Sequence, residues 1–131
     1  MKLVVPYVVT LIAFAGLDAI WLGFVANRFY RTELGGLMAE KFNLWAAIAF
    51  YLIYALGVMV FAVAPTLSTG TWRDAAFWGF LFGFFAYATY DLTNLATVRD
   101  WPVRLTFVDL LWGACLTAIG AACAHAVARS A

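Results

Sequence analysis

The sequence has few charged residues. Asp, Glu, Lys and Arg make up only 11% of its 131 residues, whereas 66% are hydrophobic. A soluble domain carries roughly 25% charged residues, so this composition excludes a water-soluble protein and predicts a single domain in a membrane. The eight Lys and Arg exceed the seven Asp and Glu by one. Because such a balance leaves no basic surface for nucleic-acid phosphates, we exclude nucleic-acid binding.

Cysteine and histidine are also scarce. Cys115 and Cys123 lie eight positions apart in one apolar segment, which puts them about 12 Å apart along a helix, too far for a disulfide. With His125 as the one histidine and no Cys-x-x-Cys spacing, the sequence predicts neither a metal site nor a cofactor. No nucleotide motif or nucleophile-and-base set is visible either, so enzymatic activity stays undecided.

Long apolar segments make up most of the rest. A membrane-spanning helix needs about 20 mainly apolar residues, and four segments meet this length, at approximately residues 3–26, 44–64, 75–98 and 103–127. The sequence therefore predicts an all-α fold, an integral membrane four-helix bundle.

The connections carry the signals of turns and membrane interfaces. A polar loop is expected at 27–43, a second loop begins at Pro65, and a tight turn ends at Pro102. Aromatic residues near the expected span ends suit the headgroup level; they are Tyr30, Phe42, Trp45, Trp72 and Trp101. Glycines at close spacing predict helix packing faces; they are Gly79 with Gly83, Gly16 with Gly23, and Gly113 with Gly120.

Basic residues predict the orientation, because cytoplasmic loops carry more Lys and Arg. The first and third loops hold five such residues, Arg28, Arg31, Lys41, Arg99 and Arg104. The opposite face holds three, Lys2, Arg73 and Arg129. This difference favours termini outside the cytoplasm.

Three aspartates fall inside the predicted spans. Asp18 lies ten positions before Arg28, Asp91 lies eight before Arg99, and Asp109 lies seven after Pro102. At 1.5 Å per residue, all three sit about 10–15 Å below the face formed by loops 1 and 3. Three separate helices thus deliver carboxylates to one depth, and we predict that they converge on a common cavity.

Polar neighbours accompany each aspartate at helical spacing. Asn94 follows Asp91 by three positions, and Tyr90 precedes it. Trp21 and Trp112 stand three positions after Asp18 and Asp109, so each carboxylate has an expected donor on its own helix. Two interpretations stay open. The aspartates form a ligand, proton or substrate site, or they hold the helices together as buried polar contacts.

The same motifs carry a resemblance. The segments Asp18-x-x-Trp21-Leu22-Gly23, Tyr90-Asp91-Leu92-Thr93-Asn94 and Asp109-x-x-Trp112-Gly113 resemble a bacterial family of predicted four-helix membrane proteins, the family of unknown function numbered twenty-one seventy-seven. The resemblance implies architecture and a bacterial inner-membrane location, and it transfers no catalytic residue. Genes of that family often neighbour those of lipid-modifying enzymes, including enzymes of cyclopropane fatty acids, so the resemblance also implies a role in membrane-lipid metabolism.

The sequence therefore favours a membrane protein that handles a lipid or small polar molecule. The expected ligand-binding residues are Asp18, Trp21, Tyr90, Asp91, Asn94, Asp109 and Trp112. Four arginines are expected to ring the pocket mouth and attract an anionic headgroup; they are Arg28, Arg31, Arg99 and Arg104. The alternatives are a proton-coupled transporter acting as an oligomer and an accessory subunit of a larger membrane complex.

Overall fold

The structure is a computed structural model that describes residues 3–38, 41 and 43–130. Over this part of the chain it is almost entirely helical and contains no β-strand. Lys2 and Phe42, which entered the expectations on orientation and interface anchoring, lie outside the described residues.

The first two predicted spans each end in a wider helical turn. The α1 helix (Val4–Ile20) continues as a π-helical turn, Trp21–Val25. The α3 helix (Leu44–Val58) continues as a second π-helical turn, Met59–Val63, and then a 3-10 turn, Ala64–Thr66. Such turns insert an extra residue into the helical repeat and so rotate the side chains that follow.

The third and fourth spans form a long antiparallel pair, α4 (Trp72–Thr97) and α5 (Val103–Ser130). A reciprocal capping box begins α4, because the Thr71 side chain accepts from the first turn while Asp74 accepts from the Thr71 backbone N–H. This cap starts the helix three residues before the expected position. The turn after α4 contains Asp100, whose positive φ of 62° reverses the chain.

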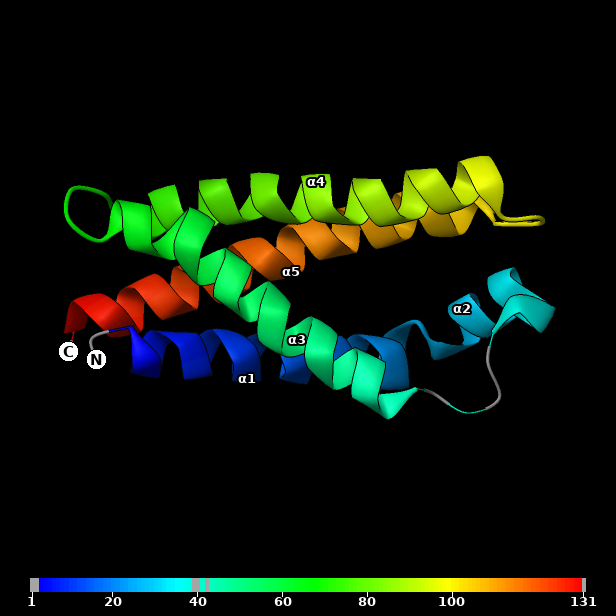
Figure 1. Cartoon of the computed structure of the whole chain (residues 1–131), viewed down its shortest axis with the longest axis horizontal. Helices are drawn as coiled ribbons and strands as arrows, with labels where there is room; N and C mark the ends of the chain where they lie inside the picture. Colours follow the sequence, from blue (N-terminus) through cyan, green and yellow to red (C-terminus); the bar gives the residue numbers. More distant parts are fainter. Residues whose placement is uncertain (1–2, 39–40, 42, 131) are drawn as a thin grey trace.

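These helices form the expected membrane bundle (Figure 1). The α1 and α4 helices both pack against α5, and α3 crosses from α1 toward α4. The first and third connections lie at one end, and the termini and second connection lie at the other. The predicted fold class, an all-α membrane helix bundle, is confirmed.

Within the described chain, three stretches are long and apolar enough to cross a membrane, Val4–Phe24, Leu44–Thr66 and Val103–Ser130. The α4 helix has 26 residues, which gives a length of about 39 Å, more than a bilayer core requires. Its Tyr, Gly and Thr residues and Asp91 lower its hydropathy. The α4 helix runs beside α5, one of these three stretches, for most of its length (Figure 1).

Close packing of α4 on α5 depends on glycine. A Cβ added to Gly79 would lie 2.8 Å from the Ala121 Cβ, and one added to Gly83 would lie 2.6 Å from the Gly113 carbonyl oxygen. The predicted Gly79 and Gly83 packing face is therefore confirmed.

The other predicted glycine faces are confirmed only at Gly113, which packs against the Tyr87 ring. Gly16, Gly23 and Gly120 have no described atom within 4 Å of an added Cβ, so the expectation that they form close helix contacts is wrong. Seven-residue spacing places two glycines on one helix face, but it does not determine which neighbour that face meets.

The expectation of a simple polar loop at 27–43 is also wrong. Residues Asn27–Leu34 form a short helix, α2, which lies against the end of the bundle. Its inner side carries Tyr30, which packs with Ala26 and Leu105, while Arg31 is exposed on its outer side. The spacing of four between Ala26, Tyr30 and Leu34 produces this amphipathic helix. Tyr30 is thus buried and is not an interfacial anchor.

Candidate functional site

Asp18 on α1 accepts hydrogen bonds from two other helices. The Tyr51 hydroxyl of α3 donates to its Oδ2 at 2.6 Å, and the Trp112 indole Nε1 of α5 donates to its Oδ1 at 3.1 Å. Each carboxylate oxygen has two lone pairs, so each retains one acceptor position. Asp18 therefore connects three helices and can still accept hydrogen bonds from another molecule.

Asp109 on α5 accepts a hydrogen bond from a residue of the short α2 helix. The Tyr30 hydroxyl donates to its Oδ1 at 2.8 Å and accepts from the Trp21 indole Nε1 at 3.2 Å. Burial, followed by the charge of Asp109, raises the pKa of the Tyr30 phenol. The hydroxyl consequently keeps its proton at neutral pH and remains a donor to the carboxylate.

The two indoles join these contacts into one assembly. Trp21 and Trp112 stack with ring centroids 4.4 Å apart and planes 9° apart. Each indole interacts with the carboxylate of the other helix. Trp112 donates directly to Asp18, and Trp21 donates to the Tyr30 hydroxyl, which in turn donates to Asp109. The expected pairing within each helix is wrong for both tryptophans, because both side chains turn toward the α1–α5 contact.

Asp91 on α4 has a different environment. Its side chain is fully buried, and neither carboxylate oxygen has a hydrogen-bond partner within the described chain. The expected donor Asn94 does not hydrogen-bond to it, although Asp109 lies close enough for the two carboxyl groups to influence each other's charge. Asp91 and Asp109 thus form a close acidic pair.

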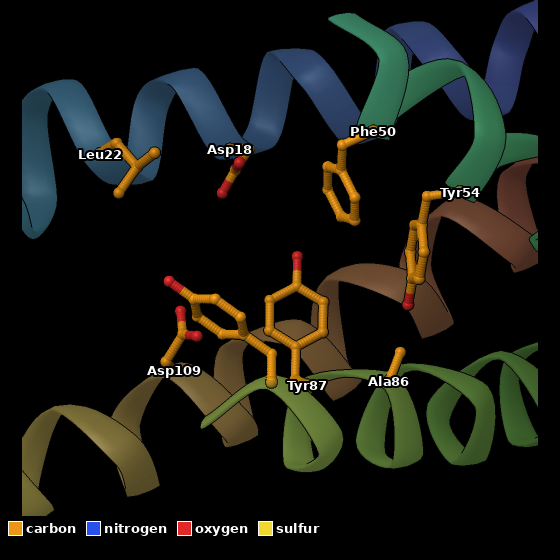
Figure 2. Close-up of a pocket in the computed structure, with 8 residues that line it drawn as sticks. Asp18, Leu22, Phe50, Tyr54, Ala86, Tyr87 and Asp109 are labelled. Atoms are coloured by element: carbon orange, nitrogen blue, oxygen red, sulfur yellow. The ribbon is translucent and has the colours of Figure 1, made fainter. Parts of the chain in front are cut away.

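Asp18 and Asp109 line one cavity of about 320 Å³ (Figure 2). Figure 2 shows the Asp18 side chain on α1 facing the Asp109 side of the cavity, with the Tyr87 ring extending from α4 beside them. The remaining wall is mostly aromatic and apolar; it consists of Leu22, Phe50, Tyr54, Ala86, Tyr87 and Tyr90. Of the three aspartates predicted to converge, two border the cavity, and Asp91 lies beside one of them.

A second cavity of about 680 Å³ adjoins the first, because Leu22 and Tyr90 line both. Arg31, expected at the pocket mouth, lines this second cavity and donates from Nε to the Asn27 Oδ1 at 2.9 Å. Trp101 also lines it, and its buried indole Nε1 has no partner among the described residues.

The other three arginines do not border either cavity. Arg104 lies 4.0 Å from the Glu33 carboxylate and above the Phe29 ring. Arg28 and Arg99 are exposed at the same end of the bundle. Of the four arginines expected to ring the mouth, Arg31 alone lines a cavity in the described part of the chain.

Comparison with known proteins places these features in a family. Residues 3–126 match the family described as "Predicted membrane protein (DUF2177)". The chain belongs to this family. No curated protein and no solved structure matches the chain. The DUF2177 match covers both cavities and all three aspartates, and its description states a membrane location.

Several cavity residues of this DUF2177 chain were missed by sequence reasoning. Tyr30 looked like an interfacial residue, and Tyr87 and Phe50 looked like ordinary apolar residues. Tyr54 on the second span also lines the first cavity, and its hydroxyl pairs with the Thr117 Oγ1 at 2.8 Å. One signal was available, since Tyr87 lies one helical turn before Asp91 and so shares its face.

The cysteines and histidine of the DUF2177 chain lie away from these cavities. Cys115 and Cys123 are free thiols, and the buried His125 Nε2 lies 3.1 Å from the Thr66 carbonyl oxygen. Within the described ranges, no three His, Cys, Asp or Glu side chains converge as metal ligands.

Proposed function

We propose that this membrane protein binds a lipid or a small polar molecule in the 320 Å³ cavity between α1, α3, α4 and α5. Asp18 and Asp109 contact the polar group of the bound molecule. The observation that supports this function is the presence of two carboxylates, from separate helices, on the wall of one otherwise apolar and aromatic cavity. Ligand sites commonly combine such a wall with a few convergent polar groups, in volumes of about 300–1,000 Å³.

Helix assembly alone accounts for only part of this arrangement. Asp18 and Asp109 do connect helices, through the hydroxyls of Tyr51 and Tyr30. A purely structural role gives no reason for an open cavity beside these bonds, nor for a fully buried Asp91 without a partner. Polar groups inside a membrane are costly and are found mainly where they serve a substrate or ion.

The wall of the cavity favours access from the lipid. Leu22, Phe50 and Tyr90 line it, and each is exposed at the surface of the bundle. At this depth the exposed surface faces acyl chains. We further propose a bacterial inner-membrane location, with the termini outside the cytoplasm and the α2 end inside.

Native mass spectrometry of the protein released from a mild detergent tests the proposed site. The wild type is expected to retain a bound molecule, and Asp18→Asn and Asp109→Asn are expected to lose it. Both substitutions keep the local contacts, because an amide oxygen still accepts and a tyrosine hydroxyl can also accept from the amide NH₂.

Asp100→Asn is the matched control. It makes the same change of charge at an exposed turn, and asparagine tolerates the positive φ found there. Retention that is equal in the wild type and in both cavity variants would overturn the proposed site.

A further inference from the structure

We infer that the group bound between Asp18 and Asp109 is an organic ammonium cation. This inference rests on the proposed function and adds the chemical class of the ligand. It depends on the charge of the cavity, its aromatic wall and its route of access.

The cavity collects negative charge without a counter-ion. Asp18 and Asp109 line it, and no Lys, Arg or His among the described residues does. Within the described chain one ion pair is present, Arg104 with Glu33, and it lies outside the cavity. The carboxyl group of Asp91 lies beside Asp109 but does not line the cavity, and it brings no positive charge to it.

This charge favours a cation over an anion. Each ionised carboxylate in a span costs about 2.5–3.5 kcal/mol on insertion scales, and an ammonium group between two of them offsets that cost. An anionic headgroup would instead meet like charges at short range, where the low dielectric strengthens repulsion. The anionic ligand expected from the arginine-rich loops therefore does not fit this cavity.

The aromatic wall gives a second, independent reason. Phe50, Tyr54 and Tyr87 line the cavity with Tyr90, and Figure 2 shows the first three rings around the space. The Phe50 and Tyr54 rings lie nearly parallel, with planes 25° apart, whereas the Tyr54 and Tyr87 rings stand at 82°. Rings set at different angles form a corner, and such aromatic corners attract ammonium groups through their π faces.

The same features argue for an organic ammonium over a metal ion. No cluster of three metal-ligating side chains occurs in the described part of the chain. The Asp18 oxygens already accept from Tyr51 and Trp112 and each has one acceptor position left. Single remaining positions suit the N–H donors of an amine, or the outer surface of a methylated ammonium, better than a complete metal coordination shell.

The ammonium group can belong to a lipid headgroup or to a free amine. A lipid is compatible with the exposed wall residues, through which it could enter from the bilayer. It is also compatible with the second cavity, where the Arg31 guanidinium could bind the lipid phosphate. A free amine needs the first cavity alone. The carboxylates and aromatic rings would recognise both in the same way.

Competition among lipids with identical acyl chains tests the inference on the full-length protein in a nonionic detergent. The probes are phosphatidylethanolamine and phosphatidylcholine, which carry an ammonium group, and phosphatidylglycerol and diacylglycerol, which carry none. In native mass spectra we expect the wild type to retain the ammonium lipids about tenfold more than the others, since a charge-assisted contact commonly changes affinity by that factor or more. Asp18→Asn and Asp109→Asn should abolish the preference, whereas Asp100→Asn should keep it.

A second arm uses the free cations tetramethylammonium and ethanolammonium as chlorides, compared with sodium chloride at the same ionic strength. A rise in melting temperature with these cations that disappears in Asp18→Asn identifies a free amine as sufficient and supports the inference. Phe50→Leu should weaken binding of tetramethylammonium while leaving the fold intact, because Phe50 is partly exposed.

The outcomes separate this inference from the proposed function. One contrary result is that the wild type instead retains phosphatidylglycerol or diacylglycerol preferentially, and loses this preference in both Asp→Asn variants. That result would contradict an ammonium ligand but would still support a binding site between Asp18 and Asp109. Absence of any Asp-dependent binding, of lipid or free cation, would overturn both.

Discussion

Gly113→Ala should damage both the bundle and the cavity. Gly113 on α5 faces the Tyr87 ring of α4, and a Cβ added there would lie closer than 3.0 Å to several ring carbons. The ring is anchored mid-helix and cannot withdraw without leaving the cavity wall. The substitution therefore forces α4 from α5 or displaces Tyr87.

Two opposing free-energy contributions set the change in stability expected for Gly113→Ala. Overpacking of a well-filled contact costs about 1–3 kcal/mol, while replacing a helical glycine by alanine gains up to about 1 kcal/mol from helix propensity. Gly120→Ala supplies the matched control, because Gly120 lies two turns further along α5 with no atom within 4 Å of an added Cβ. The propensity gain cancels between the two variants, so their difference isolates the overlap with Tyr87.

Thermal unfolding in one detergent measures this difference. We expect Gly113→Ala to melt roughly 3–10 °C below Gly120→Ala, corresponding to about 1–3 kcal/mol. Retention of the bound molecule should also fall in Gly113→Ala alone. A second substitution, Tyr87→Leu, should recover part of the lost stability, because the smaller side chain relieves the overlap. Equal melting temperatures for the two glycine variants would refute this account of the α4–α5 contact.

Three further predictions concern the aspartates and the orientation. Asp91→Asn should leave the melting temperature unchanged or raise it, because it removes a buried carboxyl group that lies beside Asp109 without a hydrogen-bond donor among the described residues; a clear fall would show that Asp91 has a stabilising partner. Tyr30→Phe should lower stability by about 1–3 kcal/mol in thermal unfolding, because the Asp109 carboxylate loses a charge-assisted donor, whereas an unchanged midpoint would argue against that bond. A C-terminal fusion should be active with a reporter that works only outside the cytoplasm, and activity of a cytoplasm-only reporter would reverse the proposed orientation.

Composition and periodicity determined the membrane class of this protein. A chain that is 66% hydrophobic, with apolar segments of about 20 residues, must satisfy its backbone hydrogen bonds inside lipid, and helices do so within each segment. The sequence also predicted a similar depth for Asp18, Asp91 and Asp109, because helical rise is nearly constant, and Asp18 and Asp109 do line one cavity. The close contact of α4 and α5 at Gly79 and Gly83 was predictable for a similar reason, since small residues permit it.

Only the tertiary structure decided which side chains meet. The rotation of each helix about its axis depends on all its neighbours together, and the π-helical turn that begins at Trp21 shifts that rotation further. For this reason each indole bonds toward the carboxylate of the other helix, and Tyr30 is buried against Asp109. Asp91, in contrast, has no donor among the described residues. The aromatic wall of Phe50, Tyr54 and Tyr87 arises in the same way, because residues distant in sequence line a common space only after the helices have packed.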